Sequence, residues 1–145
     1  MTLDSVVNKL GSKYDKVNWS QAVLYADRHT GVESKPCDKI IKSYIADNKN
    51  SIRYILDLGD GIDNPFMSTF PVDPKFKYTS QEEFDMYATH LRELDKLVPR
   101  AKKIIIAGNH DKSRLSNSKK LNRGIASLRN LEYENVLKEA LENQG

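Results

Sequence analysis

The chain has 145 residues, of which 23 are Lys or Arg and 20 are Asp or Glu, so its formal net charge at pH 7 is +3. This length suits one domain, and a hydrophobic share of 39% allows a buried core. The charge is too small to indicate nucleic-acid binding by itself, and a single cysteine, Cys37, excludes an internal disulfide.

No apolar run in the sequence approaches the roughly 18 residues of a membrane span, and the N-terminus lacks the apolar centre of a signal peptide. We therefore expect no membrane association, and with a lone cysteine the composition favours a cytoplasmic protein. We expect one domain over residues 1–145. It divides into an N-terminal extension that resembles a short amphipathic helix (1–19), a core that contains the sequence motifs (20–114), and a basic loop with a C-terminal helix (115–145).

The core alternates short apolar runs with longer segments of helical periodicity. This alternation of strand and helix predicts βαβ units, and so an α/β fold with a mostly parallel sheet flanked by helices. Strands are predicted at residues 21–27, 52–60 and 102–108, and helices at 34–49, 79–98 and 125–144.

The helix at residues 79–98 has a clear start in the sequence. Thr79 or Ser80 is suited to cap it, and Glu82 or Glu83 falls in its first turn, which is the spacing of a capping box. We expect this N-terminus to be well defined.

Each predicted strand ends in a polar cluster. In open α/β sheets, ligands bind at the carboxyl ends of the strands, so the three clusters should converge in space. The convergent side chains are Asp27, His29, Asp60, Asp63, Asn109, His110 and Asp111.

Carboxylates packed this closely would repel each other and lose hydration, unless a divalent cation compensates for both effects. Oxygen and nitrogen ligands without a thiolate suit Mn²⁺ best, with Zn²⁺, Fe²⁺ or Ni²⁺ as alternatives. On an extended segment, Asp27 and His29 would share one face, because strand side chains alternate with period two. The sequence therefore predicts a metal site in which Asp27 lies within about 10 Å of Asp60.

The three clusters, in this order, resemble the motifs Asp-x-His, Gly-Asp-x-x-Asp and Gly-Asn-His-Asp of the calcineurin-like metallophosphoesterases. They stand here as Asp27–His29, Gly59–Asp63 and Gly108–Asp111. The resemblance covers about residues 21–114, which would be the N-terminal half of the family's α/β sandwich. The segment 65–85 is similar to the loop and helix of phage- and archaeal-type members.

The resemblance implies the ligands of a two-metal site. Asp27 and His29 would bind the first ion, Asp60 would bridge both ions, and Asn109 would bind the second. In a complete site, two ions would activate a bridging water for in-line attack on phosphorus.

The resemblance also implies residues that act on the substrate. His110 would serve near the leaving group as a general acid or charge stabiliser, oriented by Asp63. The run from residue 112 to 131 contains six basic and no acidic residues, and would attract a phosphate-rich substrate through Lys112 and Arg114. The alternative interpretation of this run is a solvated helix face.

The sequence departs from the family pattern in two places. The family has a further histidine and a Gly-His-x-His segment downstream, whereas this chain has only three histidines, and one of them, His90, is interpreted as a surface or half-buried helix residue. Asn64 and Asp111 stand where the protein-phosphatase branch has Arg and Glu, which favours phosphodiesterase- or nuclease-like relatives.

The sequence therefore predicts a metal-dependent phosphoester hydrolase, with a phosphodiester or nucleic acid as substrate. The alternative is a fragment or remnant that binds metal, phosphate or a partner protein without turnover. Because a full sandwich would cover this sheet with later sequence, we expect an apolar sheet face that self-associates or docks to a missing C-terminal half. As an alternative, the last helix folds back over that face.

Overall fold

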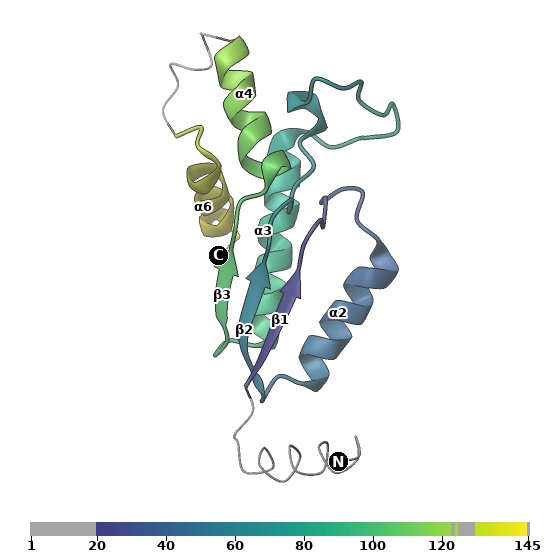
Figure 1. The fold of residues 1–145 in the computed structure, drawn as a ribbon, viewed down its shortest axis with the longest axis vertical. Coiled ribbons are helices and arrows are strands. Elements are labelled where there is room, and N and C mark those ends of the chain that lie inside the picture. The colour runs from purple at the N-terminus through teal and green to yellow at the C-terminus, as the bar shows by residue number, and fades with distance from the viewer. Residues whose placement is uncertain (1–19, 123, 125–129, 145) are drawn as a thin grey trace, which may run out of the picture.

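The computed structural model describes residues 20–122, 124 and 130–144, so the predicted N-terminal helix lies outside the described residues. Figure 1 shows three parallel strands side by side in chain order, with helices between and after them, and the predicted α/β class is confirmed. The strands are β1 (Gln21–Tyr25), β2 (Ile52–Asp57) and β3 (Lys102–Ile105). The helices are α2 (Lys35–Asp47), α3 (Ser80–Leu97), α4 (Arg114–Leu121) and α6 (Tyr133–Asn143), with short helical turns at Pro65–Met67 and Asn109–Ser113.

The strands end two or three residues earlier than predicted. Asp27 and Asp60 follow β1 and β2 with φ angles of 53° and 55°, which lie outside the extended region, so the chain leaves the sheet there. The segment predicted as a basic loop contains α4, and α6 begins at Tyr133, later than predicted. The first part of the predicted last helix, residues 125–129, lies outside the described residues.

Helix α3 begins at the predicted cap. The Thr79 hydroxyl accepts a hydrogen bond from the Glu82 backbone N–H at 3.3 Å, and the Glu82 carboxylate accepts from the Thr79 N–H at 2.7 Å. This reciprocal capping box fixes the start of the longest helix in the described chain.

The helices lie on one side of the sheet. Right-handed crossovers between strands in the order β1, β2, β3 place both connecting helices on the same face. Ile45 of α2, Ile55 of β2 and Leu94 of α3 accordingly share one buried cluster. In a second cluster, Tyr133 and Leu137 of α6 pack against α3.

The opposite face of the sheet is apolar and exposed. Leu24, Tyr54 and Ile106 lie on it, with exposed fractions of 58%, 45% and 50%. Within residues 20–122 and 130–144 no helix covers this face, because α6 packs on α3 instead, so the alternative that the last helix covers it is wrong for its described part. Self-association through this face stays a prediction.

No helix among the described residues combines the length and the apolar character that a bilayer span requires.

His90 is buried, which corrects the interpretation of a surface or half-buried helix residue. Its side chain is 4% exposed, its ring meets the Tyr25 ring edge-on at a centroid distance of 5.9 Å, and its Nδ1 lies 3.5 Å from Asp38 Oδ1. The reason is tertiary: α3 is flanked by α2 as well as by α6, so two sides of the helix are covered. Burial lowers the pKa of His90 from 6.5 to about 4.

The exposed sheet face gives the first prediction. We expect the protein to bind a hydrophobic dye, and the double variant Leu24→Lys, Ile106→Lys to lose most of that dye fluorescence, because both charges interrupt the apolar patch. The control is Ile40→Lys, which places a charge at an exposed position of α2. Equal fluorescence in the double variant and the control would show that this face is covered in solution.

His90 gives the second prediction. Because its folded pKa of about 4 lies below its unfolded value of 6.5, the unfolded chain binds a proton that the folded chain excludes. The free energy of unfolding therefore decreases as the pH falls from about 6.5 to about 4, and the total decrease due to His90 is about 3 kcal/mol. Chemical denaturation of the wild type and of His90→Gln at a series of pH values between about 7 and about 4 should show that the unfolding free energy of the variant falls less steeply with decreasing pH. If the unfolding free energies of the two proteins fall equally with pH, the lowered pKa of His90 is wrong.

Candidate metal centre

The loop after β1 runs alongside the loop after β2 and continues the parallel hydrogen bonding of the two strands. The Asp27 N–H donates to the Gly59 carbonyl at 3.0 Å, and the His29 N–H donates to the Asp60 carbonyl at 2.9 Å. An isolated parallel bridge joins Thr30 to Ile62 just beyond. These backbone bonds bring the first two predicted clusters into contact.

The loops after β2 and β3 meet through two glycines. A Cβ atom on Gly59 would lie 2.6 Å from the backbone nitrogen of Gly108, and a Cβ on Gly108 would lie 2.1 Å from Asp60 Oδ1. At this separation the His110 N–H donates to Asp60 Oδ1 at 2.8 Å. The glycines are therefore required because the two loops approach more closely than any side chain allows.

Left-handed backbone is concentrated in these loops. Of the five non-glycine residues with positive φ in the described chain, four lie here: Asp27, His29, Asp60 and Asn64. Such conformations cost roughly 1–3 kcal/mol each and persist where the surroundings enforce them, which is common at functional sites. The premise that Asp27 and His29 lie on an extended segment was therefore wrong, although His29 Nε2 still lies 4.0 Å from Asp27 Oδ1.

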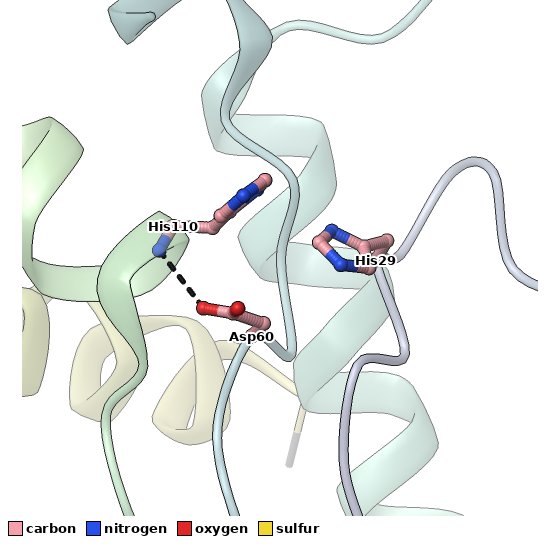
Figure 2. A group of neighbouring side chains, drawn as sticks. All are labelled: His29, Asp60 and His110. Carbon is pink, nitrogen blue, oxygen red and sulfur yellow. Dashed lines mark hydrogen bonds between the residues drawn. The ribbon is translucent and has the colours of Figure 1, made fainter.

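Three side chains form a group that could hold a metal ion. His29, Asp60 and His110 each offer one ligand atom, and these atoms lie within 4.8 Å of one another. Figure 2 shows that the three side chains come from the three separate loops and surround a common space. Two imidazoles and a carboxylate suit a transition metal such as Mn²⁺, Zn²⁺ or Fe²⁺.

The other two predicted ligands lie at the edge of this group. Asp27 is outside it, and its side chain is 74% exposed. Asn109 is the first residue of the helical turn after β3, and it is exposed on the wall of an adjacent cavity that His110 also lines. The cluster thus contains His29 and Asp60 of the predicted ligands, and His110, which was predicted to act on the substrate.

Asp63 lies against both histidines. Its Oδ1 atom is 3.0 Å from Nδ1 of His29 and 3.0 Å from Nδ1 of His110, whose rings are 4.5 Å apart between centroids. An ionised carboxylate only accepts hydrogen bonds, so each histidine donates its Nδ1–H to Asp63. Asp63 therefore contacts both rings, and its role in orienting His110 for a reaction, which the resemblance implied, stays a prediction.

Arg114 reaches the cluster, and Lys112 does not. The Arg114 guanidinium donates from Nη2 to His110 Nε2 at 3.0 Å, and Nη1 lies 3.7 Å from Asp63 Oδ1. Arginine only donates, so His110 Nε2 is the acceptor in this contact. Lys112 instead forms an exposed ion pair with Glu134 at 2.6 Å. Of the two cations that were predicted to attract a substrate, Arg114 therefore contacts the cluster, whereas Lys112 pairs with Glu134.

Asp111 is fully buried and binds the backbone of the loops that contain Asp60 and Gly108. Its Oδ2 accepts the N–H groups of Asp60 and Gly108, both at 2.8 Å, and its Oδ1 accepts the Ile62 N–H at 3.1 Å. Burial raises the pKa of Asp111 and the backbone donors oppose that rise. Asp111 is thus a positioning residue that ties the β2 and β3 loops together.

Glu83 of α3 holds the far end of the β2 loop, a role that the sequence analysis missed. Its Oε1 accepts the N–H groups of Asp63 and Asn64 at 2.9 and 3.0 Å, and burial raises its pKa to about 7. One signal was available: Glu83 shares the buried stripe of α3 with Tyr87 and Leu91 at intervals of four residues. An acidic residue on an apolar stripe indicates a buried polar contact.

Two cavities flank the cluster, with volumes of about 430 and 520 Å³, and both are lined by Ser68, Phe70 and Arg114. The smaller one lies under the segment between β2 and α3, which the sequence analysis did not assign to the site. The available signal was the alternation of lysine and aromatic residues from Lys75 to Tyr78.

No family model, curated protein or solved structure matches the chain.

The third prediction concerns Asp111. Asp111→Asn replaces one acceptor oxygen with a donor that faces a backbone N–H, so we expect it to lower the unfolding free energy by about 2–4 kcal/mol. Mn²⁺ affinity should fall too, because Asp60 loses a backbone anchor. Denaturant titration and Mn²⁺ binding measure the two effects. The control is Asp47→Asn at an exposed position of α2, which should change stability by less than about 0.5 kcal/mol. Equal stability of the two variants would refute the role of Asp111.

Proposed function

We propose that this chain is a divalent-metal-dependent phosphoester hydrolase that acts on phosphodiesters. The observation that carries the proposal is the grouping of His29, Asp60 and His110 at the carboxyl ends of three parallel strands, with Asp63 and Arg114 in contact with the histidines. The order of the motifs supports it, since they resemble those of calcineurin-like metallophosphoesterases. In that family the chain would correspond to the first half of the sandwich.

The donor set fits a divalent cation. His29 and Asp60 would hold it together with Asp27, whose Oδ1 lies 4.0 Å from His29 Nε2. A second ion would share Asp60 and take Asn109 as a ligand. Mn²⁺ is the preferred ion, with Zn²⁺, Fe²⁺ or Ni²⁺ as alternatives. Once bound, the cation would polarise a phosphoryl oxygen and lower the pKa of a coordinated water.

His110 would move a proton at its Nε2 atom. In the structure Nε2 accepts from Arg114 while Nδ1–H donates to Asp63. A phosphate group would compete for the Arg114 guanidinium through charge-assisted hydrogen bonds, and would thereby free Nε2. Nε2 would then take up a proton from solvent to give an imidazolium, which Asp63 would stabilise through Nδ1–H. That proton would pass to the leaving oxygen and return the imidazole to its neutral form.

The second candidate is a binding protein for metal or phosphate without turnover. One observation favours it: His110 belongs to the same 4.8 Å group as His29 and Asp60. If His110 ligates the ion, its imidazole cannot also serve as the proton donor. The two candidates therefore differ in what His110 does.

The fourth prediction tests these candidates with bis(4-nitrophenyl) phosphate and Mn²⁺. We expect metal-dependent but slow hydrolysis, because few protein ligands hold the second ion. Asp60→Asn should abolish both turnover and Mn²⁺ binding, whereas Asp47→Asn should change neither. His110→Asn should reduce turnover about a hundredfold or more with Mn²⁺ affinity retained.

Two results would count against the hydrolase. Mn²⁺ binding without any turnover above buffer would leave the binding protein as the function. Loss of Mn²⁺ affinity in His110→Asn would make His110 a ligand and remove it as the proton donor. Fast turnover that depends on Asp60 would instead show that the few ligands suffice.

A further inference from the structure

The cavity beneath the segment between β2 and α3 opens beside the metal centre. Asp63 and Arg114 form its wall toward the cluster, and aromatic and basic side chains form the other walls. Its volume of about 430 Å³ lies within the range of about 300–1,000 Å³ that is typical of small-molecule sites. The residues that the argument uses are Phe70, Lys75, Phe76, Lys77 and Tyr78.

The aromatic rings are held in place. The Phe76 ring meets the Tyr78 ring nearly edge-on at a centroid distance of 5.9 Å, and meets Phe66 at 6.0 Å. Gly31 backs this pair, since a Cβ there would lie 3.1 Å from Tyr78 and 3.3 Å from Phe76. Phe70 is different: its ring is 76% exposed at the mouth of both cavities. The cavity thus presents fixed aromatic walls and one accessible ring.

The charged groups that line the cavity are three cations, Lys75, Lys77 and Arg114, and two carboxylates, Asp63 and Asp73. Lys75 and Lys77 form no ion pair within the described part of the chain, and Arg114 lies on the wall toward the metal cluster. The carboxylate of Asp73 accepts the Lys75 backbone N–H at 2.9 Å and so supports the loop. Flat apolar rings together with cationic groups match a ligand that combines a planar ring with phosphate.

A second cavity shares Ser68, Phe70 and Arg114 with the first. It has a volume of about 520 Å³ and is lined by polar groups that include Asn109, Ser113 and Asn117, as well as by His110. A phosphodiester has two organic arms on one phosphorus atom. Two cavities that meet at Arg114 provide room for both arms, whereas a phosphomonoester needs only one.

We propose that the cavity of Phe70, Phe76 and Tyr78 binds the base of a nucleotide unit, whose phosphate lies at Arg114 beside the metal cluster. The substrate of the site is then a nucleoside phosphodiester, with its second arm in the cavity of Asn117. That this nucleoside phosphodiester is a substrate rests on the proposed hydrolase function, whereas binding of its base does not require turnover. The nucleotide unit is either free or the end of a single strand.

The fifth prediction is measured in EDTA by calorimetric titration, so that metal and turnover play no part. We expect the protein to bind AMP at least about tenfold more tightly than ribose 5-phosphate, because only AMP has a base to stack on the rings. Phe70→Ala and Tyr78→Ala should each remove most of that difference, and binding of ribose 5-phosphate by the variants shows that the site is still folded. The control is Tyr54→Ala, which removes an exposed aromatic side chain from the distant sheet face.

The outcomes separate this inference from the proposed function. Equal affinity for AMP and ribose 5-phosphate, or a base preference that survives in both cavity variants, would overturn the inference even if the protein hydrolyses phosphodiesters. A base preference that depends on Phe70 and Tyr78 would support it even if no turnover is found. A short single-stranded oligonucleotide that binds more tightly than AMP would assign the unit to a strand end, and equal binding would assign it to a free nucleotide. Both of these results require the base preference and support the inference.

Discussion

The site depends on one buried carboxylate. Asp111 accepts the backbone N–H groups of Asp60 and Gly108, and so joins the loop that contains Asp60 to the segment that contains His110. Without this shared acceptor, the N–H groups of Asp60, Gly108 and Ile62 would lose their partner, and for the buried donor of Ile62 the cost is about 1–3 kcal/mol. Burial raises the pKa of Asp111, and these backbone donors oppose that rise.

Helix α3 supplies the rest of the support, and therefore connects the core to the site. Tyr87 donates from its hydroxyl to Asp57 at 2.6 Å at the end of β2, and Glu83, one turn earlier, holds the backbone of Asp63. These buried bonds offset the cost of the left-handed residues in the loops. The same helix packs its apolar stripe against α6 and the sheet, so any shift of α3 would be transmitted directly to Asp63 and both histidines.

Local sequence patterns determined the fold class and the approximate place of the site. Alternating apolar runs and helical periodicity predicted a parallel sheet, because that alternation suits few other architectures. Thr79 and Glu82 predicted the start of α3, because a capping box depends only on residues in one turn. The position of polar clusters after each strand predicted convergence, because parallel strands end at the same edge. All of these signals arise from short stretches of chain.

Only the tertiary structure decided what each polar residue does. Asp111 and Glu83 bind backbone N–H groups of segments that are far from them in the sequence. His90 is buried because α2 covers a second side of α3. Right-handed crossovers in the order β1, β2, β3 placed the helices on one face and left Leu24 and Ile106 exposed on the other. The aromatic cavity likewise needed Gly31 behind its rings. A local pattern such as Glu83 on the apolar stripe of α3 indicates burial, but the partner of each residue depends on segments that lie far apart in the chain.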